Sequence, residues 1–199
     1  MYRFYLAAVD MLPAALILLP VYWVLNRACL HHAGTSILYY LFSCYLSVVY
    51  VLVGLPNITY IRPELNLNLI PFLGLFRDLE SSVLNILLFI PLGMALPILW
   101  KTFRRLQKTL LLGFGISLAI ELLQILTFRT TDVNDLITNT LGTGLGFLIA
   151  RFLLRRFPKL LHAHNSAYVL ELKVLLSIVL LVMFFLYPFA SAALWNFLL

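Results

Sequence analysis

Long apolar runs alternate with short polar connections along the whole 199-residue chain. A helix needs about 20 mostly apolar residues to cross the hydrocarbon core of a bilayer. Six runs approach that length: 4–25, 37–55, 83–100, 109–127, 136–153 and 174–198. Transmembrane strands would instead give short segments that alternate between apolar and polar residues. The pattern therefore predicts an all-α integral membrane protein, a compact bundle of about six transmembrane helices (five is the alternative count), forming one transmembrane domain over 1–199.

The composition supports this class. Hydrophobic residues make up 63% of the chain and charged residues 11%, with a mean hydropathy of +1.00. A soluble domain is about half apolar and a quarter charged, so an ordinary water-soluble fold is excluded. The first run carries Arg3 and Asp10 and lacks a small-residue cleavage pattern, so we expect it to be a retained helix rather than a signal peptide.

Basic residues predict the orientation. They concentrate in two connections, 101–108 and 154–173, and the positive-inside rule places such connections in the cytoplasm. With six spans, both termini are then expected outside the cell. The net charge of +6 accordingly describes a membrane face that meets anionic lipid, and we expect no nucleic acid partner.

Two connections have unusual composition. The apolar stretch NLNLIPFLGLF (66–76) is too short to span a bilayer, so it is either a re-entrant or interfacial segment or a loop that covers the bundle. The basic 154–173 connection is either an interfacial helix or ordinary flanking sequence. All four histidines fall in predicted cytoplasmic connections. We therefore expect no metal site and no cofactor, although carboxylate and amide oxygens would suit Mg²⁺.

The run 109–127 carries a polar stripe. Gly113, Ser117, Glu121 and Gln124 are spaced by four, four and three residues, which places them on one helical face. Glu121 is expected about six residues inside the outer end, or roughly 10 Å at about 1.5 Å per residue. A carboxyl group near a helix centre costs about 2.5–3.5 kcal/mol on insertion scales. Glu121 is therefore either a functional group or a hydrogen-bonded structural acid.

The run 136–153 repeats the pattern on its own face. Its stripe comprises Asp132, Asp135, Asn139, Gly142 and Gly146. The two glycines form a GxxxG pair suited to close helix packing. Asp132 is either a helix cap or a site residue, because an acid at a helix start is favoured for both reasons.

A third stripe lies on the run 83–100, where Asn85, Phe89 and Gly93 recur every four residues and Pro91 is expected to kink the helix. Three spans would thus aim polar groups at one level near the outer surface, which predicts a site there. Arg129, in the turn between two of these spans, is expected either to pair with an acid, to bind an anion, or to anchor at the headgroups.

Four ordered motifs sit on these residues: NLIPF (68–72), NILLFIPLG (85–93), SLAIELLQ (117–124) and TDVNDLITNTLGTGLG (131–146). In them the chain resembles the VanZ-like family of bacterial membrane proteins, over a core of about residues 65–150. The residues on the family pattern are Asn85, Pro91, Gly93, Glu121, Gln124, Asp132, Asp135, Asn139 and Gly142. The resemblance implies a cell-envelope protein of the bacterial cell membrane, because the family's namesake is associated with low-level teicoplanin (glycopeptide) resistance. No reaction comes with the family.

Three hypotheses follow. The first is an outward-facing polar pocket that binds or modifies an amphipathic envelope ligand: a lipid-linked wall precursor, a lipid headgroup or the tail of a lipoglycopeptide. Its candidate catalytic residues are Glu121, Asp132 and Asp135, and its candidate binding residues are Asn85, Gln124, Arg129 and Asn139. The second is a non-catalytic scaffold for cell-wall proteins that uses its glycine faces. The third, ranked last, is a proton-coupled transporter. Whether any reaction is catalysed stays open. We expect the glycines Gly93, Gly113, Gly142 and Gly146 to serve helix packing.

Overall fold

A computed structural model of the chain describes residues 2–25, 27, 33–68, 70–72, 79–127, 129–157 and 169–198. Residue contacts divide the chain into two compact units. The first combines Met1–Arg62 with Leu170–Leu199, and the second is Pro63–Val169. The sequence predicted one transmembrane domain, so the contacts resolve a finer organisation. The second unit contains the whole of the predicted 65–150 core.

Helical segments follow all six predicted runs. They are α1 (Tyr2–Leu25), α2 (Ala33–Leu52), α3 (Leu79–Leu99), α4 (Leu106–Gln124), α5 (Val133–Arg156) and the last run, which comprises α6 (Val169–Leu181), the π-helical turn η4 (Val182–Leu186) and α7 (Tyr187–Leu198). Among the described residues, four helices are long and apolar enough to cross a membrane, by length and composition: α3, α4, α5 and Glu171–Phe197. Leu12–Leu25 and Ser36–Leu52 are shorter apolar helices. The predicted all-α membrane class is confirmed.

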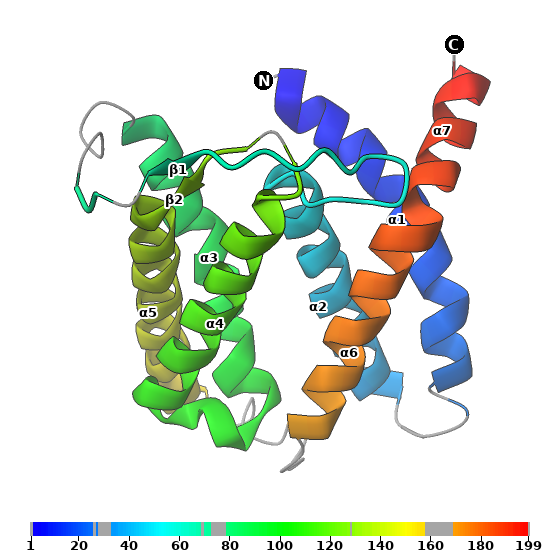
Figure 1. Cartoon of the computed structure of the whole chain (residues 1–199). Coiled ribbons are helices and arrows are strands. Elements are labelled where there is room, and N and C mark those ends of the chain that lie inside the picture. The colour runs from blue at the N-terminus through cyan, green and yellow to red at the C-terminus, as the bar shows by residue number, and fades with distance from the viewer. Residues whose placement is uncertain are drawn as a thin grey trace. The chain divides into compact units, whose positions relative to one another are not determined.

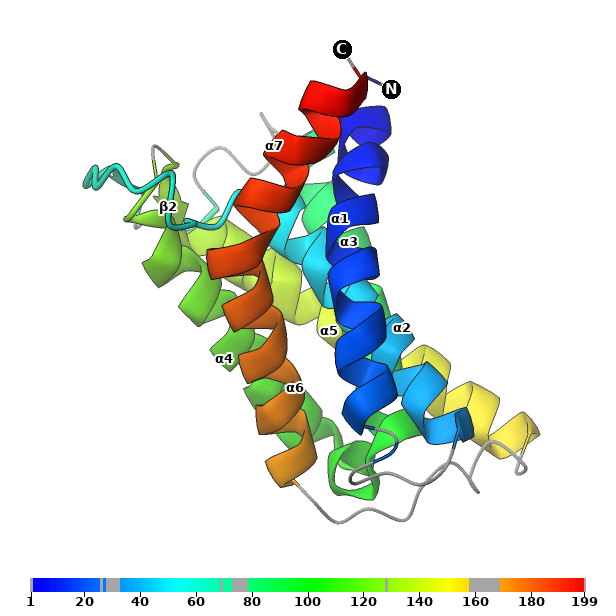
Figure 2. The same ribbon diagram turned by 90° about the vertical axis from the view of Figure 1, so that its right-hand side faces the viewer.

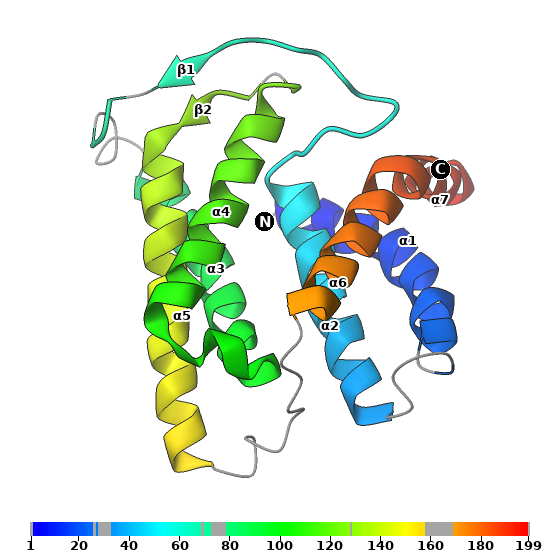
Figure 3. The same cartoon turned by 60° about the horizontal axis from the view of Figure 1, so that its bottom comes forward.

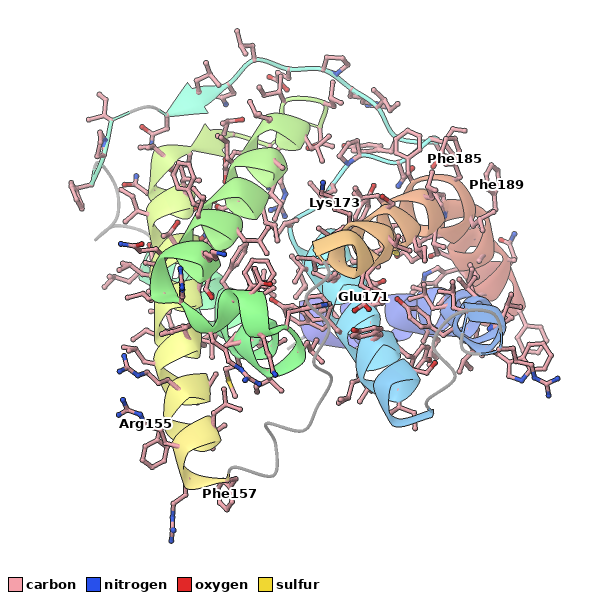
Figure 4. All side chains as sticks on the ribbon, turned by 90° about the horizontal axis from the view of Figure 1, so that it is seen from below. Arg155, Phe157, Glu171, Lys173, Phe185 and Phe189 are labelled. Atoms are coloured by element: carbon pink, nitrogen blue, oxygen red, sulfur yellow. The ribbon has the colours of Figure 1, made fainter. Side chains whose placement is uncertain are left out.

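The first unit contains the helices α1, α2, α6 and α7 (Figures 1 and 2). Hydrogen bonds between side chains join different helices of this unit. The Tyr22 hydroxyl of α1 bonds to Ser43 Oγ of α2 at 2.5 Å. The Tyr39 hydroxyl of α2 donates to the carboxylate of Glu171, which Figure 4 labels on α6. Such bonds stabilise helix association because hydrocarbon offers no alternative partner.

A proline explains the irregular turn in the last helical run. Pro188 has no N–H to donate to the carbonyl of Phe184, four residues earlier. The backbone N–H of Ile58 donates to that carbonyl instead, at 3.1 Å. π-Helical turns are typical of such interruptions in an α-helix. Here the Phe184 carbonyl, which has no partner within its own helix at Pro188, binds the connection that follows α2 through Ile58.

The second unit is a three-helix bundle in which α3 and α5 run in the same direction and α4 runs in the opposite one (Figure 3). Glycines bring the α3 and α5 backbones together. A Cβ atom on Gly142 would lie 2.3 Å from the Ile86 carbonyl oxygen, and one on Gly146 would lie 2.1 Å from that of Ile90. Gly93 faces the Thr143 carbonyl in the same way. The GxxxG pair is therefore buried against α3 of its own chain, and it does not offer a face to a partner protein.

The helix α4 has a polar interior and an apolar exterior. Its large side chains point outward, with Leu111 73% exposed and Leu122 57% exposed. Its buried face consists mainly of small and polar residues: Thr109, Gly113, Ser117, Ile120, Glu121 and Gln124. This arrangement is the reverse of a soluble helix, and it suits a protein whose surroundings are hydrocarbon.

The segment predicted to re-enter or cover the bundle is extended at residues 66–68 and forms a bend and a turn at residues 70–72. Its residues Leu67–Asn68 form strand β1, which pairs in parallel with β2 (Thr131–Asp132). This part of the segment fits the covering loop; residues 69 and 73–76 lie outside the described part. In the basic 154–173 connection, α5 continues to Arg156, and residues 158–168 lie outside the described part.

The glycine contacts generate a test of packing. Gly142→Ala and Gly146→Ala should each destabilise the protein by roughly 1–3 kcal/mol, because the added methyl group would overlap a backbone carbonyl of α3. The measurement is thermal unfolding in detergent. Gly115→Ala is the control, because nothing lies within 4 Å of its Cβ position. It should leave stability unchanged or raise it by up to about 1 kcal/mol, and equal losses at all three positions would contradict this packing.

Candidate functional site

The helix α4 ends earlier than the apolar pattern predicted. Its last residue is Gln124, whereas the predicted span continued to residue 127. The backbone N–H and the hydroxyl of Thr127 both donate to the Gln124 carbonyl, at 2.9 and 3.1 Å, and these bonds close a tight turn. Glu121 therefore lies in the last turn of α4, three residues from its end, whereas the predicted span placed it six residues from the end. Its depth in the membrane stays a prediction.

The side chain of Glu121 joins two helix ends. It is only 4% exposed, and its Oε2 accepts a hydrogen bond from the backbone N–H of Asp132 at 2.9 Å. The Thr131 hydroxyl donates to the Glu121 carbonyl at 3.0 Å. Glu121 thus fastens the end of α4 to the residues that begin α5.

Asp132 caps α5. Its Oδ1 accepts from the backbone N–H of Asn134 at 2.8 Å, which satisfies one of the free amides of the first turn. Its Oδ2 accepts from Asn68 Nδ2 at 2.9 Å. Both oxygens of Asp132 thus have N–H donors. Its predicted role as a helix cap is confirmed, and its role as a site residue stays a prediction.

The segment that contains β1 is bonded to the same helix start. The Thr131 N–H donates to the Asn66 carbonyl at 2.9 Å. The Phe72 N–H donates to Asn134 Oδ1 at 2.7 Å, and Phe72 has a left-handed backbone with φ of 64°. Figure 3 shows β1 and β2 at the end of the unit where α4 ends and α5 begins. An amide-rich strand therefore borders Glu121 and Asp132.

Deeper in the unit, α4 and α5 meet along a line of polar side chains. Asn139 Nδ2 donates to Ser117 Oγ at 2.9 Å, and one turn further the side chain of Thr143 packs against Gly113. The Thr143 hydroxyl donates to the Asn139 carbonyl at 2.9 Å. We refer to the residues Ser117, Glu121, Asn139 and Thr143 as the α4–α5 seam.

The seam ends in a group of charges. Asp135, in the first turn of α5, acts electrostatically on Glu121, as do Asp132 and the positive charge of Arg129. Arg129 is exposed, and its backbone N–H donates to the Thr127 carbonyl at 2.7 Å. A buried carboxyl group beside two further acids and one cation is suited to bind polar groups or exchange a proton.

Some buried amide atoms in this unit have no hydrogen-bond partner among the described residues. They include Oδ1 of Asn139, a residue 2% exposed, and Nδ2 of Asn85 on α3. Both residues lie within one helical turn of the Gly142–Ile86 contact. Buried polar atoms without partners are rare in folded proteins, so these atoms mark a place where a polar group from outside the chain could bind.

The structure brings some predicted site residues together and separates others. Glu121, Asp132 and Asp135 gather at one end, with Gln124 buried in the same last turn of α4. Asn139 lies about one turn deeper, and Asn85 is on the third helix. Arg129 stays at the surface. Whether these residues bind or catalyse is still a prediction.

Three contributors were not predicted as site residues: Asn68, Thr131 and Asn134. Asn134 follows a capping Asp by two residues, a spacing that could have indicated its place in the cap. Asn68 and Asp132 are 64 residues apart, and nothing local indicates their pairing. Among the described residues, no group of three or more His, Cys, Asp or Glu side chains is placed to hold a metal.

The all-helical fold and its inward polar residues define a multi-pass membrane protein with a buried carboxyl group at one end of a three-helix unit. The family model VanZ/LLP1 matches residues 35–155, more than half of the chain. The chain belongs to the VanZ/LLP1 family. The match begins well before the predicted core of about 65–150, so it includes α2.

A curated relative supports the same family. Protein VanZ of Enterococcus faecium is 38% identical to this chain over 84 residues. The alignment covers 41% of this chain and 50% of that protein, so the chain spans about half the length of the relative it matches. No solved structure matches the chain significantly.

The capping geometry predicts the effect of changing Asp132. Asp132→Ala removes both acceptor oxygens and should lower stability in detergent by about 0.5–2 kcal/mol. Asp132→Ser keeps a capping oxygen and should recover most of that loss. Glu64→Ala, which removes an exposed carboxylate outside the helices, is the control and should leave stability unchanged. If Asp132→Ala unfolded at the wild-type temperature, the cap would not contribute to stability.

Proposed function

We propose that this chain is a bacterial cell-envelope protein that contributes to tolerance of teicoplanin and related lipoglycopeptides by binding an amphipathic envelope ligand. Membership of the VanZ/LLP1 family and the likeness to Protein VanZ support the resistance association. The ligand classes that fit are a lipid-linked wall precursor, a lipid headgroup and the lipid tail of the antibiotic. All three join a polar group to an apolar chain.

The observation that carries the proposal is the buried carboxyl group of Glu121 in a helix with an apolar exterior. Glu121 is 4% exposed, whereas Leu118 and Leu122 on the same helix are 40% and 57% exposed. A ligand with a polar head and an apolar tail would find complementary surroundings for both parts within one or two helical turns. A purely polar ligand would not contact the exposed leucines, and a purely apolar ligand would not bond to the Glu121 carboxyl group.

The residues divide into roles within this proposal. Glu121 and Asp135 accept hydrogen bonds from the polar group, and Glu121 would supply or remove a proton if the ligand is also modified. Asn85, Gln124 and Asn139 orient the ligand through their amides. Arg129 pairs with an anionic group such as a phosphate. Asp132 holds the start of α5 in place, and a bound divalent cation is not needed for any of these roles.

The charges within the second unit support an orientation. The basic residues of the α3–α4 connection and of the α5 C-terminus share one end, which is the lower end in Figure 1: Lys101, Arg104, Arg105, Lys108, Arg151, Arg155 and Arg156. Glu121, Asp132 and Asp135 lie at the opposite end. By the positive-inside rule, the basic end faces the cytoplasm and the carboxylates face the outer surface, where envelope ligands are located.

Two alternatives receive less support. A proton-coupled carrier needs ionisable groups along a path. Among the residues whose burial the structure describes, Glu121 is the one buried side chain of the Asp, Glu, Lys, Arg and His types. The scaffold hypothesis required free glycine faces, and Gly142 and Gly146 already pack against α3. Proton or solute flux through liposomes containing the purified protein would restore the carrier hypothesis.

The proposal predicts a loss of drug tolerance without a loss of fold. Glu121→Gln keeps an oxygen that can accept from the Asp132 N–H, but it replaces the carboxyl group by an amide that cannot ionise. Asp135→Asn makes the same replacement of a carboxyl group by an amide at position 135. Both variants should reduce teicoplanin tolerance to that of cells lacking the protein. The measurement is the inhibitory concentration in a susceptible strain, at equal membrane abundance. Glu80→Gln is the control, and full tolerance in both site variants would refute the proposal.

The ligand itself can be identified. Protein purified gently from membranes should retain one class of lipid or lipid-linked molecule, detected by mass spectrometry of the extract. The Glu121→Gln protein should lose that class while it keeps bulk phospholipid. Identical extracts from the two proteins would place the ligand away from the α4–α5 seam.

A further inference from the structure

The turn between α3 and α4 is a rigid platform for basic residues. It consists of the 3₁₀ helix η2 (Lys101–Arg104), which follows the buried Trp100. The rings of Trp100 and Phe103 meet edge to face at 6.4 Å, and the Thr109 hydroxyl donates to the Phe103 carbonyl at 2.6 Å. Two buried aromatic rings and this bond hold the turn in one conformation.

The turn and the start of α4 carry four basic residues: Lys101, Arg104, Arg105 and Lys108. Residues three apart in a 3₁₀ helix lie on the same side, which places Lys101 beside Arg104. Lys101, Arg105 and Lys108 are exposed, whereas Arg104 is half-buried. Its Nε donates to the Pro97 carbonyl at 3.3 Å, and its Nη2 is buried with no partner among the described residues.

This placement conflicts with the electrostatics of α4. A helix N-terminus carries partial positive charge and is stabilised by acidic residues. The first turn of α4 contains none, and its N-cap residue, Arg105, makes no side-chain capping bond within the described structure. At the C-terminus of α5 the situation is opposite, because Arg155 and Arg156 complement the dipole there (Figure 4 labels Arg155). Helix electrostatics therefore account for the α5 arginines but not for the α4 cluster.

The positive-inside rule explains the side of the membrane on which these residues lie, but it does not explain an uncapped helix start crowded with cations. An anion from outside the chain would resolve both the repulsion and the missing cap, since phosphate oxygens accept from guanidinium, ammonium and free helix N–H groups. Leu106 and Leu111, 42% and 73% exposed on the same helix, supply apolar surface next to the cations.

We propose that η2 and the first turn of α4 form a binding site for the phosphate group of an anionic phospholipid, with Lys101, Arg104 and Arg105 as its ligands. The acyl chains of that lipid lie along the exposed leucines of α4. This site is at the opposite end of the unit from Glu121, and it does not depend on the proposed function of the α4–α5 seam.

The test is native mass spectrometry of the purified protein with equal amounts of phosphatidylglycerol and phosphatidylcholine. Wild-type protein should retain phosphatidylglycerol preferentially. The substitutions Lys101→Gln and Arg105→Gln, both at exposed residues, should each weaken that retention by about tenfold or more, because each removes a charge-assisted hydrogen bond to the phosphate. Arg104→Gln should weaken it at least as much, and thermal unfolding of each variant verifies that the fold is intact.

Arg155→Gln is the matched control. It removes one positive charge from the same end of the unit, at the C-terminus of α5, where the helix dipole accounts for the presence of a basic residue. It should change retention by less than about twofold. A loss as large as that of Lys101→Gln would show general attraction to the basic end and would overturn the site. Equal retention of the two lipids, or displacement of phosphatidylglycerol by an equal concentration of inorganic phosphate, would overturn it as well.

Discussion

The structure of this chain depends on one constraint: polar atoms surrounded by hydrocarbon must find their partners inside the protein. The hydroxyls of α5 satisfy it locally, because Thr138, Thr140 and Thr143 each donate to the carbonyl four residues earlier. The amide of Asn139 and the carboxylate of Glu121 have no such local partner, so they bond across to the neighbouring helix. The polar interior of the second unit is the result, and it is also the part of the molecule in which a ligand's polar group could be recognised.

The same constraint explains what the sequence could predict. Long apolar runs mark helices whose exteriors meet lipid, and the polar or small residues that interrupt them at three- and four-residue intervals mark the inward face. This is why Glu121, Asn139 and the glycines Gly142 and Gly146 could be placed on packed helix faces from spacing alone.

Contacts between distant segments had no such periodic signal. The pairing of β1 with β2 joins residues 64 positions apart through two-residue strands, too short for any alternation to appear. The end of α4 was misplaced by three residues for a related reason: Ile125 and Leu126 continue the apolar pattern, whereas the bonds of Thr127 to the Gln124 carbonyl stop the helix. In both cases single hydrogen bonds decided the outcome, and composition did not reveal them.

The helix α5 packs against α3 through backbone atoms and against α4 through side chains, so the two interfaces differ in rigidity. Against α3, backbone meets backbone at Gly142 and Gly146, so these two helices form a rigid pair that cannot separate without opening a void. Against α4, contact is made by side chains, through Ser117 with Asn139 and Glu121 with the start of α5. A molecule that offers a hydroxyl, an amide or an acid can exchange its own hydrogen bonds for these. Of the two helices that pack on α5, the one that a ligand would displace more easily is therefore α4, which carries Glu121.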